Sequence, residues 1–180
     1  ANENTWYIEN KAVNWKKWYL DDEGNQPVPN PPDDTVCPGF IRFSTLPVWQ
    51  IEKAVNNQTS LNAEINLFGT PGFYFCGYLA YLEEWYQAIH RDPDEEYPCK
   101  AAGWIHVNKN ISLEDSIEAT NITIKSTVEK VKKQIKINEN SLAKFNTLED
   151  ENLQRNDNFT GKKHSNTFVT FIINFFKNLN

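Results

Sequence analysis

The aromatic residues of this chain are confined to one part of it. All six Trp and all seven Tyr lie between Trp6 and Trp104, whereas the last third has Phe as its only aromatic residue. Hydrophobic residues make up 39% of the sequence, so a packed core can form only where they are concentrated. We therefore expect residues 1–111 to form an aromatic head. Residues 112–180 are expected to form a helical C-terminal region with a polar linker at about 154–166.

The acidic residues are also concentrated in the head. Up to Ile111 there are 15 acidic and 8 basic residues, and from Ser112 onward there are 9 and 10. An acidic surface repels phosphate backbones, so the composition argues against a nucleic-acid partner. Five lysines between 125 and 136 are interrupted by Glu129, which is typical of a solvated helix face.

The head is predicted to be α+β, a small aromatic-rich β-sandwich with a helical insertion. Apolar or alternating segments predict short strands at 40–43, 48–55, 63–68, 73–76 and 104–107. Between the last two, Leu79, Leu82, Tyr86 and Ile89 recur at helical spacing and predict a helix over 79–91. The strands at 63–68 and 73–76 are expected to pair across the Gly69-Thr-Pro-Gly72 turn.

A long amphipathic helix is predicted after the head. Ser112 and Ser126 each open a capping-box pattern, and Val128, Val131, Ile135 and Leu142 continue a heptad-like seam that suggests a coiled coil. The Asn121 sequon favours the later start, because a glycan cannot lie inside such a seam.

A short apolar helix is predicted over 167–178. Its apolar face needs a partner, which could be the head, another protein subunit or a membrane surface. The candidate contact residues are Phe168, Phe171, Ile172 and Phe175.

Three features suggest an exported protein. The sequence has no Met, which suggests removal of a signal peptide. It has Asn-x-Ser/Thr sequons at Asn57, Asn110, Asn121 and Asn158. In an oxidising compartment its three cysteines, Cys37, Cys76 and Cys99, would give one disulfide and one remaining thiol. These features predict a secreted or surface-exposed glycoprotein.

One pair of residues, Cys76 and His106, could carry out catalysis. Cys76 lies where a predicted strand ends and a helix begins, and a helix N-terminus stabilises a thiolate. His106, on a later predicted strand, could act as its base. No Asn or Asp stands out as a residue that would orient the histidine. The sequence therefore leaves open an exported cysteine hydrolase that uses Cys76 and His106.

No metal or cofactor site is predicted. Cys76, His90, Cys99 and His106 lack the close pairing of zinc ligands, and no phosphate-binding glycine motif occurs. The aromatic residues Trp15, Trp18 and Tyr19 could form a binding surface, because Trp and Tyr dominate interface hot spots, or they could belong to the core.

One segment resembles plant-type cupredoxins, the phytocyanins. In Thr70-Pro-Gly-Phe-Tyr-Phe-Cys76-Gly77 a T-P-G turn leads through aromatic residues to Cys-Gly, as in the cysteine-bearing strand of that family. Copper would also need a histidine upstream and another soon after the cysteine, but the first histidine is His90. The resemblance therefore implies a copper-free domain like the ephrin ectodomains, which are protein ligands.

Together these patterns predict a protein–protein recognition module, or a subunit of a viral or parasite surface complex, that meets a host receptor or a companion subunit. The alternative is the cysteine hydrolase.

Overall fold

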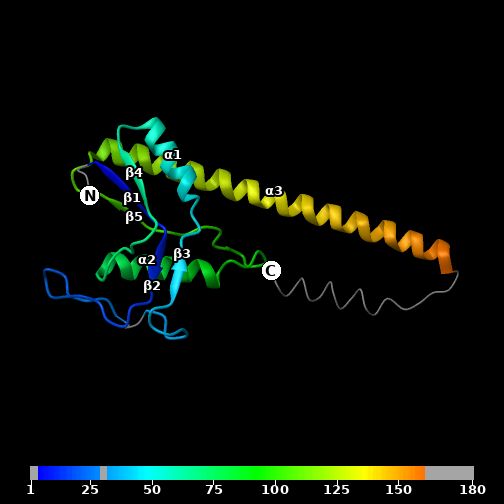
Figure 1. Ribbon diagram of the computed structural model, residues 1–180, viewed down its shortest axis with the longest axis horizontal. Coiled ribbons are helices and arrows are strands. Elements are labelled where there is room, and N and C mark those ends of the chain that lie inside the picture. The colour runs from blue at the N-terminus through cyan, green and yellow to red at the C-terminus, as the bar shows by residue number, and fades with distance from the viewer. Residues whose placement is uncertain (1–3, 29–31, 161–180) are drawn as a thin grey trace. The chain divides into compact units, whose positions relative to one another are not determined.

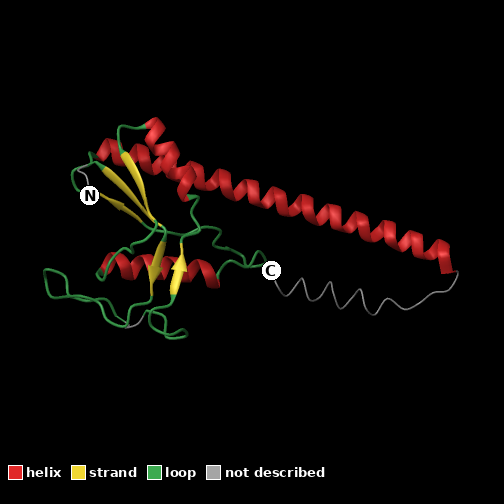
Figure 2. Cartoon of the chain, viewed as in Figure 1, coloured by secondary structure: helices red, strands yellow, loops and turns green. Residues whose placement is uncertain are grey.

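In the part of the chain that the structure describes, the fold is α+β with few strands and three helices, one of them long (Figures 1 and 2). The computed structural model describes residues 4–28 and 32–160, and from residue 145 onward it describes the backbone alone. The elements in chain order are β1 (Thr5–Glu9), β2 (Lys11–Val13), β3 (Ile41–Phe43), α1 (Val48–Gln58), β4 (Asn62–Asn66), α2 (Phe75–Ile89), β5 (Ile105–Val107) and α3 (Leu113–Thr160). The predicted β-sandwich is not formed, because the strands make two small separate sheets.

The larger sheet has the strand order β4-β1-β5, with β1 parallel to β4 and antiparallel to β5. Side chains alternate between the two faces of a strand. On one face Trp6 and Ile8 pack with Ile51 and Val55 of α1 and with Ile122 of α3, so these two helices cover that face (Figure 1). The other face carries polar side chains.

Helix α1 replaces the strand predicted over 48–55. Its buried residues Val48, Ile51 and Val55 recur every three to four positions, which places them on one helix face against the sheet. Pro47 stands immediately before the helix, a position at which proline's missing N–H costs nothing. The helical spacing of these apolar residues therefore outweighs their β-branched character.

Helix α2 begins earlier than predicted and replaces the strand expected over 73–76, so the hairpin with 63–68 does not exist. The helix packs on the two-stranded β2-β3 sheet, where Ala80 and Tyr81 meet Ala12.

Helix α3 begins at the first of the two predicted starts. Ser112 Oγ accepts a hydrogen bond from the Asp115 backbone N–H at 3.1 Å, and Glu114 and Asp115 lie in the positive first turn. Asn121 therefore lies within the helix on an exposed position, and its sequon did not delay the start.

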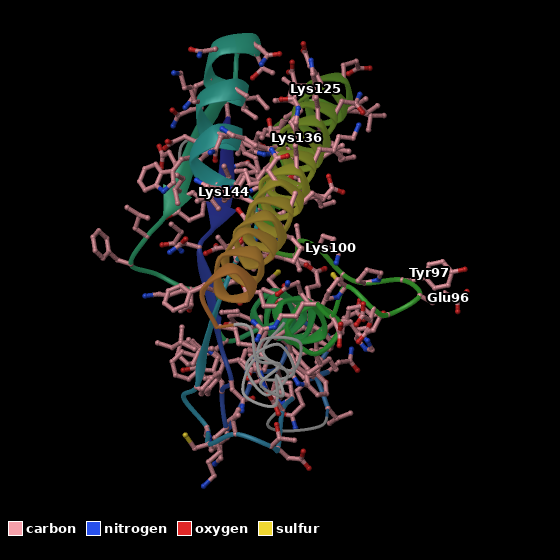
Figure 3. The ribbon with its side chains drawn as sticks, turned by 90° about the vertical axis from the view of Figure 1, so that its right-hand side faces the viewer. Glu96, Tyr97, Lys100, Lys125, Lys136 and Lys144 are labelled. Carbon is pink, nitrogen blue, oxygen red and sulfur yellow. The ribbon has the colours of Figure 1, made fainter. Side chains whose placement is uncertain are left out.

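The chain divides into two compact units, 1–131 and 132–180, and the predicted head lies inside the first. Within the second unit, the lysines at 136 and 144 are exposed on α3, as is Lys125 in the first (Figure 3). Among the described residues no helix has both the length and the apolar character needed to cross a membrane. The predicted contact residues Phe168, Phe171, Ile172 and Phe175 lie outside the described residues.

The expected disulfide is absent. Cys37, Cys76 and Cys99 are all free, with Cys37 exposed on a loop and the other two half-buried. The three thiols lie on separate elements of the fold, so counting cysteines could not tell which, if any, would meet.

Candidate active site

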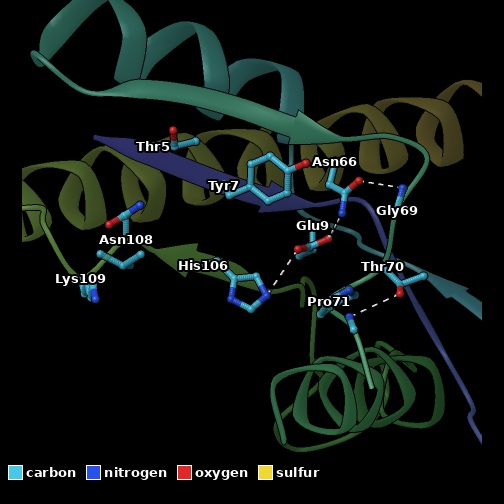
Figure 4. A pocket seen from close by; sticks show the side chains of 12 residues that line it. Thr5, Tyr7, Glu9, Asn66, Gly69, Thr70, Pro71, His106, Asn108 and Lys109 are labelled. Atoms are coloured by element: carbon cyan, nitrogen blue, oxygen red, sulfur yellow. Dashed lines mark hydrogen bonds and ion pairs between the residues drawn. The ribbon is translucent and has the colours of Figure 1, made fainter. Parts of the chain in front are cut away.

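A buried carboxyl group stands at the end of β1, on the polar face of the larger sheet. Thr5, Tyr7 and Glu9 alternate onto this face, opposite Trp6 and Ile8. The side chain of Glu9 is only 2% exposed. Asn66 lies opposite it in register on β4, and its Nδ2 donates a hydrogen bond to Glu9 Oε2 at 2.7 Å (Figure 4).

His106 lies on the strand at the other side of β1 and meets the same carboxyl group. Its Nε2 is 3.4 Å from Glu9 Oε1, and its side chain is about one third exposed (Figure 4). Burial raises the pKa of Glu9 to about 7, even though the Asn66 hydrogen bond opposes that shift. Burial also lowers the pKa of His106, so the imidazole is neutral at neutral pH and able to accept a proton.

These side chains line an open pocket of about 770 Å³ on the polar face (Figure 4). The lining comes from β1, β5, the end of β4 and the loop that follows it: Thr5, Tyr7, Glu9, Asn66, Gly69, Thr70, Pro71, Gly72, His106, Val107, Asn108 and Lys109. A pocket of this size with a few convergent polar groups and shifted pKa values is typical of an active site.

The loop that forms one wall of the pocket packs against the start of α2, where Cys76 lies. Gly72 has φ +93°, a conformation that favours glycine, and a Cβ on Gly77 would overlap the Gly72 carbonyl oxygen. This close contact is possible because Gly77 lacks a side chain, whereas at Gly72 it is the positive φ that favours glycine. Cys76, a free half-buried thiol in the first turn of α2, is next to Gly77 in the chain but is not among the residues that line the pocket.

Of the two predicted catalytic residues, His106 lines this pocket, whereas Cys76 is not among its lining residues and lies in the helix turn that the loop wall packs against. No hydrogen bond joins the two among the described residues. The structure also adds Glu9, which the sequence analysis missed. The signal was present in Thr5-Trp-Tyr-Ile-Glu9, where an acidic residue alternates with the apolar residues of a strand. Whether this carboxyl group would belong to a site depended on which strands pair with β1, and the sequence alone does not show that pairing.

The predicted aromatic binding residues have different environments. Trp18 is 4% exposed and belongs to the interior. Trp15 packs on Phe73 with ring centroids 4.4 Å apart, and Tyr19 is 57% exposed and contacts Phe73 and Tyr74. Trp15 and Tyr19 therefore extend the aromatic surface of the loop that leads to Cys76.

The sequon residues Asn57, Asn110 and Asn121 are exposed, and Asn158 lies on the part of α3 that is described as backbone only. In the described part of the chain no three His, Cys, Asp or Glu residues gather in a way that could hold a metal ion.

No family model matches the sequence, and no curated protein matches it. Solved structures do match the fold. The pyrrolidone carboxyl peptidase from the hyperthermophile Pyrococcus furiosus aligns at a TM-score of 0.56 and 24% identity, over 71% of this chain and 64% of that one. The pyrrolidone carboxyl peptidase from Thermococcus litoralis aligns at 0.55 and 22%, over 73% and 63%. The chain therefore spans less than two thirds of the length of these peptidases, and the likeness establishes the fold.

These findings correct two predictions. The cupredoxin resemblance is wrong, because the residues from Thr70 to Gly77 form a loop and a helix start in a peptidase fold. The prediction of a disulfide-bonded viral glycoprotein with a signal peptide is also wrong, because the fold is that of peptidases and the three cysteines are unpaired. The likeness favours the hydrolase alternative over the recognition module.

Proposed function

We propose that this chain is a cysteine hydrolase that cleaves the amide bond after an N-terminal pyrrolidone carboxyl group. Cys76 is the nucleophile, His106 its general base and acid, and Glu9 the carboxyl group that orients His106. The Glu9–His106 contact carries the proposal, because it lies in a pocket whose wall packs against the helix turn of Cys76. The substrate class comes from the structural neighbours, which are pyrrolidone carboxyl peptidases.

The first half of the reaction forms a thioester. His106 takes the proton of the Cys76 thiol, and the thiolate attacks the carbonyl carbon of the substrate amide. The N–H groups in the first turn of α2 have no acceptor within the helix and can stabilise the negative charge that develops on the carbonyl oxygen. His106 then donates its proton to the nitrogen of the departing amine, and the C–N bond breaks.

The second half regenerates the thiol. His106 takes a proton from a water molecule, the resulting hydroxide attacks the thioester carbon, and the C–S bond breaks. The proton on His106 returns to the Cys76 sulfur. The net reaction consumes one water and yields the free pyrrolidone carboxylic acid and an amine.

Glu9 has a positioning role in both halves. Its Oε1 faces His106 Nε2, which leaves Nδ1 of the ring for proton exchange with the thiol and the amine. Asn66 holds the other carboxyl oxygen, so the carboxyl plane cannot rotate freely.

Hydrolysis of a fluorogenic pyrrolidone carboxyl amide tests this function. Cys76→Ala should abolish turnover, and His106→Ala should lower kcat by about 10²- to 10⁴-fold, the usual contribution of general acid–base catalysis. Cys37→Ser and Cys99→Ser are matched controls that each remove a thiol away from the pocket, and both should keep wild-type turnover. Circular dichroism confirms that each variant is folded. A folded Cys76→Ala protein with wild-type activity would overturn the proposal.

A further inference from the structure

The pocket continues well beyond the proposed catalytic residues. Tyr7 is paired in register with His106, and Thr5 lies two residues further along β1. On the other side β5 ends at Val107, and the chain passes through Asn108 to Lys109. In Figure 4, Lys109 lies at one end of the lining, Thr70 and Pro71 lie at the other, and His106 stands between them. The polar face of the sheet therefore offers a path that leads away from His106 toward Lys109.

Lys109 brings the only lysine or arginine side chain to this lining. Within the described residues its ammonium group makes no ion pair, and the pocket's carboxyl group, Glu9, is already in contact with Asn66 and His106. Tyr7 presents a phenol beside the same path. An unpaired cation in a pocket raises the local concentration of anions and favours an anionic ligand there.

The spacing indicates how far from the reacting bond that anion would lie. Lys109 follows His106 by three residues and lies in the turn after β5, so the two residues are at most about 10 Å apart along the chain. A lysine has a flexible stem, so its ammonium group can meet a charge somewhat closer than that. Since an extended peptide advances about 3.4 Å per residue, the charge would lie two or three residues from the scissile amide.

The direction of the substrate follows from its chemistry. A pyrrolidone carboxyl residue has no residue before it, so the rest of the peptide lies entirely on the leaving-amine side. The pyrrolidone carboxyl ring carries no charge, so an anionic group that meets Lys109 in the pocket lining would belong to the departing peptide. The departing peptide would then run past His106 toward Lys109.

On the basis of the proposed function, we propose that Lys109 selects substrates whose departing peptide carries a carboxylate two or three residues beyond the scissile amide. The preferred substrates are therefore short acidic peptides. The carboxylate can be an Asp or Glu side chain or the free C-terminus of a short peptide. Lys109 would attract either of them through its positive charge.

Competing peptides test this selection. The substrates are a pyrrolidone carboxyl–Ala–Asp amide and its Asn counterpart, which differ only in charge, and a pyrrolidone carboxyl–Ala–Ala peptide with either a free or an amidated C-terminus. An ion pair at a partly exposed site contributes little, so the wild-type protein should favour each charged member by about two- to fivefold in kcat/KM, through KM. The Asp and Asn substrates test recognition of a side-chain carboxylate, and the free and amidated peptides test recognition of a C-terminal carboxylate.

Lys109→Ala should reduce the charge preference to about one, and Lys109→Glu should invert it. Lys53→Ala is the matched control, because Lys53 is exposed on α1 and absent from the pocket lining. Raising the salt concentration should weaken the wild-type preference. Hydrolysis of all substrates without charge preference, or an unchanged preference in Lys109→Ala, would overturn this inference and leave the proposed function intact. A lack of hydrolysis of every substrate would overturn both.

Discussion

Among the residues whose side chains are described, Glu9 and Glu84 are the buried glutamates, and their environments differ. Glu9 lies in the pocket with His106 and Asn66 as partners. Glu84 lies on α2 away from that lining and is 3% exposed. Its Oε2 accepts a hydrogen bond from the Ala12 backbone N–H at 3.1 Å, while its Oε1 is buried without a partner among the described residues. Burial, with a smaller contribution from neighbouring Glu83, raises the pKa of Glu84 to about 8.

Glu84→Gln should stabilise the protein at alkaline pH. The unfolded glutamate has a pKa of about 4.5 and the folded one about 8, so between these values the folded state holds a proton that the unfolded state has lost. Stability from this group is therefore greatest below pH 4.5 and falls as the pH rises to 8. Gln can keep the acceptor for Ala12 without the charge, and should raise the free energy of unfolding at pH 8 by on the order of 2–4 kcal/mol.

Urea unfolding at pH 5 and pH 8 measures this effect. Glu96→Gln is the control, because Glu96 is exposed on the loop after α2 (Figure 3) and should change stability little at either pH. If wild type and Glu84→Gln lost the same free energy of unfolding between pH 5 and pH 8, the expectation would be contradicted.

Glu9→Gln should separate activity from stability. Gln cannot hold the imidazolium as a carboxylate does, so kcat should fall by roughly 10- to 1000-fold with little change in KM. Because the pKa of Glu9 is raised to about 7, ionisation of Glu9 costs stability as the pH rises from 4.5 toward 7. The variant should therefore be at least as stable as wild type at pH 8. Loss of both activity and stability at that pH would point to a structural role.

At the scale of elements, the position of the proposed nucleophile depends on how the loop after β4 meets α2. The loop approaches the helix through Gly72 and Gly77, and Trp18 also lies against Gly77. Tyr19 N–H donates to the Phe73 carbonyl oxygen at 2.8 Å, which ties the loop to the segment after β2. This packing sets the helix turn of Cys76 beside the pocket wall.

Gly77→Ala should move that turn. The new methyl group would overlap backbone atoms that cannot rotate away, which costs about 1–3 kcal/mol and displaces the loop from the helix. We expect a lower rate of Cys76 alkylation by iodoacetamide and a loss of turnover. Gly24→Ala is the control, since a Cβ there meets no atom within 4 Å and only the positive φ is strained. An unchanged alkylation rate in Gly77→Ala would show that the contact does not position the thiol.

At the scale of the whole molecule, the core of the first unit takes its last buried residues from the start of α3. Ala119 and Ile122 are 0% and 8% exposed and pack with the apolar face of the larger sheet. The unit ends at Val131. The head therefore needs the first turns of α3, which belong to the same unit.

Truncation tests this dependence. A chain of residues 1–131 should unfold in urea at the same midpoint as the full chain. A chain of residues 1–110 loses Ala119 and Ile122, which should cost at least about 3 kcal/mol through lost burial. A shorter chain that unfolds at the full-length midpoint would show that α3 is not part of the core.

How much of this was predictable varies from residue to residue. Leu79 to Ile89 were predicted as helical from their spacing, which depends only on local periodicity. Val48 to Val55 were predicted as a strand because a short apolar run does not distinguish the two structures. Cys76 and His106 were proposed as an alternative catalytic pair from residue type and position, but Glu9 was not, since its partners Asn66 and His106 come from strands 57 and 97 residues away.

The sequence by itself determined that the chain is α+β and that a long helix follows the aromatic part of the chain, because these depend on composition and local period. Only the tertiary structure decided that the three cysteines stay apart and that Glu9 meets His106 in one pocket. It alone also decided that the loop wall of that pocket packs at Gly72 against Gly77, in the helix turn of Cys76. These three features depend on which distant segments pack together in the fold. The residue pattern within each segment does not show which other segment it will contact.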